Sequence, residues 1–149
     1  MSSGQAHDII TIVTSIPCIC VIAFFFGIFP ALYFGLAYLF AGFAFNGDLD
    51  ILSQTYHRWL ILKYIWIPYR RFGHRSRLTH GFIIGTIIRL LWIAPIVIGI
   101  LYLCNVTYPV FVSYLINHLG VFIWSIIGLE SGAMSHTIAD MMSTTWKKL

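Results

Sequence analysis

The chain has 149 residues, of which 59% are hydrophobic, 17% aromatic and only 9% charged, whereas a soluble domain carries about 25% charged residues. Its mean hydropathy is +0.86. This composition excludes a disordered chain, a conventional water-soluble domain and a basic nucleic-acid-binding domain, so we expect no nucleic-acid partner. The sequence predicts a membrane protein that folds as one domain over residues 1–149.

Four apolar stretches are long enough, or nearly so, to cross a bilayer as helices, which takes about 20 residues. In chain order they are Ile9–Phe29, Ala31–Phe45, Gly81–Cys104 and Tyr108–Leu129, with Pro30 breaking the first from the second. Residues 51–79 interleave Trp and Tyr with Arg and Lys, which is typical of the membrane–water interface. Ala133–Trp146 predicts a short C-terminal helix. The predicted fold is all-α, with about four transmembrane helices, an interfacial amphipathic segment and this last helix.

The positions of the Lys and Arg residues predict how the chain is oriented. Four crossings place both termini and residues 46–80 on one side of the membrane, and eight of the nine Lys and Arg residues lie there. The ninth, Arg89, lies inside the third span. By the positive-inside rule the basic side is cytoplasmic. We therefore expect an integral membrane protein with both termini in the cytoplasm.

Asp and His residues are scarce in this chain and gather at the cytoplasmic ends of the predicted spans. His136 and Asp140 are four residues apart, so a helix places them on one face at a chelating distance. Asp48 and Asp50 directly follow a predicted helix, where both carboxylates can approach one cation. The seven candidate metal ligands are His7, Asp48, Asp50, His74, His80, His136 and Asp140. Seven ligands exceed the four of a tetrahedral zinc ion and indicate a two-metal site with open positions.

The four groups of polar residues resemble the motifs of a known family. They read Gly-Gln-Ala-His7, Gly-Asp48-Leu-Asp50, Gly-His74-Arg75-Ser-Arg-Leu-Thr79-His80-Gly and Ser-His136-Thr-Ile-Ala-Asp140. In this order they look like the LexA-regulated metal-dependent hydrolases of the bacterial inner membrane. They look even more like the relatives of those hydrolases that are common in cyanobacteria and are described as metal-binding proteins.

This resemblance runs over nearly the whole chain and includes the stretch Trp66-Ile-Pro-Tyr-Arg70. It implies a metal site built from the four motifs, in the bacterial inner membrane or a cyanobacterial membrane. The acidic motif of the family often begins with Pro and ends with His, whereas Gly47 and Ile51 occupy these positions here. One potential ligand of the family is therefore replaced by an apolar side chain.

Mixed His and Asp ligands suit one or two divalent ions, zinc first and manganese or iron next. Such ions lower the pKa of bound water toward about 7 and hold a substrate oxygen, and an Asp or His outside the coordination sphere would take the proton. Arg75 and Arg77 would bind a phosphate or carboxylate; the alternative is that they anchor the chain to anionic headgroups. The sequence predicts a membrane-bound hydrolase of an amphiphilic phosphoester or lipid-like substrate.

Arg89 is the third candidate catalytic residue beside Arg75 and Arg77. It lies nine residues beyond His80, which on a helix is about 13 Å deeper in the membrane. A cation at that depth normally faces a partner or a water-filled cavity. Its side chain could extend back toward the acidic cluster of the metal site, which we favour, or bond to Asn117 or His118.

Two other functions remain open at this level. A non-catalytic metal-binding accessory subunit of a larger membrane complex fits the short chain and its Gly81-x-x-x-Gly85 and Gly128-x-x-x-Gly132 motifs, which permit close helix packing. A metal or proton carrier would use the polar residues within the spans, but these residues do not continue to the outer face. The expected partners are membrane lipids, and other membrane proteins or a second copy of the chain.

Overall fold

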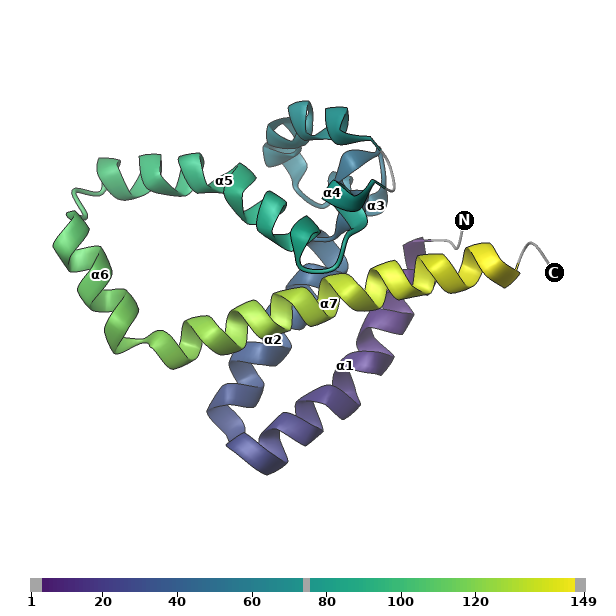
Figure 1. The fold of residues 1–149 in the computed structure, drawn as a ribbon, viewed down its shortest axis with the longest axis horizontal. Coiled ribbons are helices and arrows are strands. Elements are labelled where there is room, and N and C mark those ends of the chain that lie inside the picture. Colours follow the sequence, from purple (N-terminus) through teal and green to yellow (C-terminus); the bar gives the residue numbers. More distant parts are fainter. Residues whose placement is uncertain (1–3, 74–75, 147–149) are drawn as a thin grey trace.

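The computed structural model describes residues 4–73 and 76–146. Within these ranges the chain is helical and contains no strand, which confirms the predicted all-α class (Figure 1). The elements in order are α1 (Gly4–Phe26), α2 (Ile28–Ala44), the 3-10 helix η1 (Gly47–Asp50), α3 (Gln54–His57), the 3-10 helices η2 (Leu60–Trp66) and η3 (Pro68–Phe72), α4 (Arg77–His80), α5 (Ile84–Leu103), α6 (Tyr108–Asn117) and α7 (Leu119–Trp146).

Three segments of the described chain are long and apolar enough to span a membrane. They are α1, the segment Ile28–Asp50 that contains α2 and η1, and α5. The pair α6 and α7 passes the same criterion together, although the two helices are bent by 79° at their junction. The protein thus has three to four candidate membrane-spanning helices, in agreement with the expected number.

The break between the first two helices lies at Gly27 and not at Pro30. Gly27 has a φ of +94°, a conformation that glycine adopts without steric cost. Pro30 is the third residue of α2, where the N–H that proline lacks would have no partner within the helix. The glycine therefore makes the tight turn of the hairpin, and the proline is accommodated in the first turn of the next helix.

The last two predicted helices are arranged differently from the expectation. The fourth apolar stretch is divided at His118 into α6 and the start of α7, and α7 then continues without interruption to Trp146. The C-terminal segment is therefore part of a 28-residue helix. Gly128 and Gly132 lie inside this helix, where both are packed against α2.

Helix α7 lies across α2, and the two backbones approach closely (Figure 1). A Cβ atom on Gly128 would overlap the carbonyl oxygen of Phe34, and one on Gly132 would overlap that of Tyr38. The small residues of this motif thus serve contact within one chain. They give no support to the idea that the motif binds another membrane protein.

The segment between α2 and α4 forms a cap of short helices over the end of α2. Phe45, Leu49, Tyr56, Trp66 and Tyr69 are buried together, with Trp92 of α5 packed against them. The segment predicted to be interfacial folds into these short helices, and the side chains of Trp66 and Tyr69 are fully buried within the cap. This cap holds η1 in place beside α7.

Candidate metal centre

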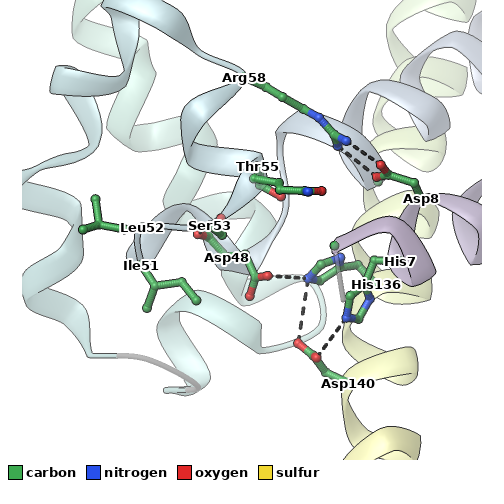
Figure 2. A pocket seen from close by; sticks show the side chains of 13 residues that line it. His7, Asp8, Asp48, Ile51, Leu52, Ser53, Thr55, Arg58, His136 and Asp140 are labelled. Carbon is green, nitrogen blue, oxygen red and sulfur yellow. Dashed lines mark hydrogen bonds and ion pairs between the residues drawn. The ribbon is translucent and has the colours of Figure 1, made fainter. Parts of the chain in front are cut away.

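Five of the predicted metal ligands converge from four elements. They are His7 of α1, Asp48 of η1, His80 of α4, and His136 and Asp140 of α7. Residues far apart in the sequence meet here because the first turns of α1 and the second half of α7 lie beside the cap (Figure 1). Figure 2 shows four of these side chains directed toward one another.

The carboxylate of Asp140 lies between two groups of ligand atoms. Its Oδ1 is 3.2 Å from Nε2 of His7, and its Oδ2 is 3.8 Å from Nε2 of His136 and 3.9 Å from Nε2 of His80. In each of two groups the ligand atoms lie within 4.8 Å of one another: His7, His136 and Asp140, and Asp48, His80 and Asp140. A carboxylate that belongs to both groups could contribute one oxygen to each of two metal ions, which is compatible with a two-metal site.

Asp48 also faces both groups. Its Oδ2 is 3.3 Å from Nε2 of His136, and its Oδ1 is 3.5 Å from Nε2 of His80. Two ligand atoms of a tetrahedral zinc ion, each about 2.05 Å from the metal, lie roughly 3.3 Å apart. The spacing of these nitrogen and oxygen atoms therefore fits divalent ions held between them. Such ions would also compensate carboxylates whose burial is costly without an opposite charge.

The position of Asp48 depends on Asn46, which directly follows the second apolar stretch and was not among the predicted site residues. The side-chain amide of Asn46 donates to the carbonyl oxygen of Gly42, and its oxygen accepts from the backbone N–H of Asp48. These bonds end α2 and begin η1. Gly47 then leaves space for His80, because a Cβ at that position would lie 2.8 Å from three ring atoms. An Asn immediately before Gly-Asp is the sequence signal for this turn.

Thr79 orients the imidazole of His80 and was also missed from the sequence. Its hydroxyl donates to the carbonyl oxygens of Gly73 or Ser76 and lies 3.0 Å from Nδ1 of His80. When the hydroxyl hydrogen is donated to one of these carbonyls, the hydroxyl oxygen can accept the hydrogen of Nδ1 in the Nδ1–H tautomer of His80. The lone pair of Nε2 is then directed at Asp48 and Asp140, as a metal-binding histidine requires.

The structure separates the two carboxylates that were expected to share one cation. Asp50 is buried and lies 3.8 Å from Nδ1 of His80, whereas Asp48 faces Nε2 of the same ring. Asp50 belongs to neither of the two ligand groups of the described residues. The opposite directions arise because η1 turns the backbone between the two positions. Asp50 thus lies on the Nδ1 side of His80 as a nearby negative charge, at a distance too long for a hydrogen bond.

Four other predicted site residues remain, and the structure describes the side chain of one of them, Arg89. His74 and Arg75 lie outside the described residues, and so does the side chain of Arg77. Arg89 is buried, with 2% of its surface exposed. It donates from Nη1 to the carbonyl oxygen of Thr79 and from Nη2 to the hydroxyl of Thr86, both at 2.8 Å. Its guanidinium thus reaches back from α5 toward the metal centre, to the residue that precedes His80.

We expect Arg89→Lys to weaken metal binding about 10-fold, which is typical when an outer partner of a ligand is lost. A lysine ammonium does not reproduce the planar fork that holds Thr79 and Thr86 together, so the support of His80 is loosened. Competition with a chelator measures the affinity, and thermal unfolding checks the fold. The exposed Arg71→Lys is the control. Equal affinities for both variants would contradict this role of Arg89.

A pocket of about 170 Å³ opens beside the ligand groups. His7, Asp48, His136 and Asp140 form part of its wall (Figure 2). The rest of the lining includes Gly4, Asp8, Gly42, Ile51, Leu52, Ser53, Gln54, Thr55 and Arg58. Arg58 was assigned from the sequence to the membrane interface, and nothing in its local pattern distinguishes it from its basic neighbours. Its place in the wall follows from tertiary packing.

Comparisons with known proteins support a metal-binding role. The family model of uncharacterized metal-binding proteins (DUF2227) matches residues 2–149. An uncharacterized protein of Aquifex aeolicus (strain VF5) is 34% identical over 61 residues, which are 40% of this chain and 43% of that protein. No solved structure matches the chain significantly. The family match supports metal binding, and neither match supplies evidence for hydrolysis or LexA regulation. The chain belongs to the DUF2227 family of metal-binding proteins.

Proposed function

We propose that the protein is a membrane-bound metal-dependent hydrolase that cleaves an amphiphilic phosphoester or lipid-like substrate. The observation that carries this proposal is that four ligand residues form part of the wall of the pocket. A structural metal site is closed by its protein ligands, whereas a catalytic site keeps a position for water and substrate. A pocket of about 170 Å³ next to the ligands provides that position.

The composition of the pocket wall supports an amphiphilic substrate. The metal ligands form its polar side, and Ile51 and Leu52 are among its apolar residues. Leu52 is 63% exposed, so an acyl or alkyl chain can follow it out of the pocket while the ester group stays at the ligands. We place this pocket at the cytoplasmic side of the membrane, following the distribution of Lys and Arg.

Divalent ions at this site, zinc foremost, would lower the pKa of a water molecule and polarise the ester that is cleaved. His7, His136 and Asp140 would hold one ion, and Asp48, His80 and Asp140 the other. Asp48 and Asp140 each have two carboxylate oxygens directed into the centre. An oxygen that is not engaged in coordination can accept the proton of the attacking water. Thr79 keeps the His80 ring in the orientation that coordination requires.

The test compares two phosphodiesters, octyl p-nitrophenyl phosphate and methyl p-nitrophenyl phosphate, with protein purified in detergent. We expect metal-dependent release of p-nitrophenol that is faster from the octyl ester, is lost in His136→Ala, and returns when zinc is added to chelator-treated protein. Two results together would contradict the proposal. Protein with its full metal content would cleave neither ester, and its X-ray absorption spectrum would show only protein ligands on the metal. That result would favour the accessory-subunit function.

A further inference from the structure

Arg58, which follows the last residue of α3, connects two other elements through its guanidinium group. Nη1 donates to Oδ1 of Asp8 in α1 at 3.0 Å and to the carbonyl oxygen of Phe43 in α2 at 2.8 Å. Nη2 donates to Oδ2 of the same Asp8 carboxylate. The guanidinium also lies 5.4 Å from the centre of the Phe43 ring. Two parallel N–H···O bonds fix the orientation of the two groups as well as their distance.

Asp8 directly follows His7 in α1, and consecutive helical residues point about 100° apart. The same turn of α1 therefore presents His7 to the metal ligands and Asp8 to Arg58, as Figure 2 shows. On the other side, Phe43 lies close to the end of α2, just before the turn that carries Asp48. The carbonyl of Phe43 thus anchors Arg58 on α2, whereas Asp48 is positioned separately, through the bond from its N–H to Asn46.

A second contact shows that the first turn of α1 is docked on α3. A Cβ atom on Gly4 would overlap the side chain of Gln54. Gln54 and Arg58 are four residues apart, and the N–H of Arg58 bonds to the carbonyl oxygen of Gln54, so both side chains can face α1. Because the first turn of a helix lacks part of its internal hydrogen bonds, contacts of this kind determine where His7 is held.

We propose that Asp8 and Arg58 form a positioning clamp that keeps His7 within coordinating distance of His136 and Asp140. The inference rests on the metal site of the proposed function. Only one of the two ligand groups contains a residue of α1. The clamp therefore controls the ion held by His7, His136 and Asp140, and leaves the ion held through Asp48 and His80 largely unaffected. A partly exposed ion pair contributes little to folding stability, so its effect is on metal affinity.

The test is a titration of the chelator-treated full chain with cobalt(II), whose absorption spectrum reports each ligand group. In Arg58→Gln and in Asp8→Asn we expect the affinity of one ion to fall about 10-fold and that of the other to stay the same. The double variant is expected to be no weaker than either single variant, because both remove one interaction. Arg71→Gln removes a nearby exposed cation and serves as the control, with unchanged affinity for both ions. Thermal unfolding verifies that each variant is folded.

The other outcomes separate the clamp from the metal site. If the parent protein binds cobalt and both single variants bind it with parental affinity, the clamp is wrong and the metal site stands. Equal weakening of both ions in folded variants would also overturn the clamp, because it would show that the ion pair does not act through His7 alone. If the parent protein binds no divalent ion, the metal site and the proposed function are wrong together. Asp8→Asn keeps the shape of the side chain, so it tests the clamp even if Arg58→Gln does not fold.

Discussion

Replacing Asp140 by alanine is expected to remove both metal ions and to lower the affinity for zinc by more than about 100-fold. Loss of a residue that only orients a ligand typically lowers metal affinity 10- to 100-fold, so the loss of a ligand itself should cost at least as much. The two oxygens of Asp140 face His7 on one side and His80 and His136 on the other. No other described residue belongs to both ligand groups. Elemental analysis of the purified variant measures the metal content, and chelator competition measures the affinity.

Asp50→Asn is the matched control for this prediction. Asp50 is also a buried carboxylate beside His80, but it faces Nδ1 and belongs to neither group. We expect this variant to keep both ions and to lose at most about 10-fold in affinity, as for the loss of an outer partner. If Asp50→Asn lost its metal while Asp140→Ala retained it, the assignment of the two carboxylates would be reversed.

Gly132→Leu is expected to have the largest effect on stability. A single Cβ atom at this position already overlaps the carbonyl oxygen of Tyr38 in α2, so α2 and α7 would have to separate. Overpacking typically costs about 1–3 kcal/mol, and because the obstacle is backbone we expect at least about 3 kcal/mol here. Thermal unfolding in detergent micelles measures the change. Metal content should fall as well, because α7 carries His136 and Asp140 while Asp48 follows α2.

The same substitution at Gly120 separates packing from helix propensity. Gly120 lies in the first turn of α7, and a Cβ there meets no atom within 4 Å. Leucine is a better helix former than glycine by up to about 1 kcal/mol, so Gly120→Leu should leave the melting temperature unchanged or raise it. Equal melting temperatures for the two leucine variants would show that α2 and α7 are not in close contact at Gly132.

The features that were predicted well are local ones, which depend on a single helix or a single run of residues. The apolar stretches predict the candidate membrane helices, because the thickness of the bilayer sets their length. His136 and Asp140 share a helix face through their spacing alone. The metal-binding character also followed from scarce His and Asp residues at one depth, and the family match supports it. Helix boundaries were less accurate, since Gly27 and Pro30 are both helix breakers and only one of them is used as such.

Other features depend on contacts that no local pattern encodes. Asp48 and Asp50 look equivalent in the sequence, but the turn of η1 directs them to opposite nitrogens of His80. Asp8 and Arg58 are 50 positions apart, so no periodicity connects them. Helix spacing and bilayer thickness act within a single segment, so the features that depend on them can be predicted from the sequence. The packing of α2 against α7 brings four elements to one place. This packing alone sets which carboxylate oxygen lies near which histidine nitrogen, and it makes Asp140 part of both ligand groups.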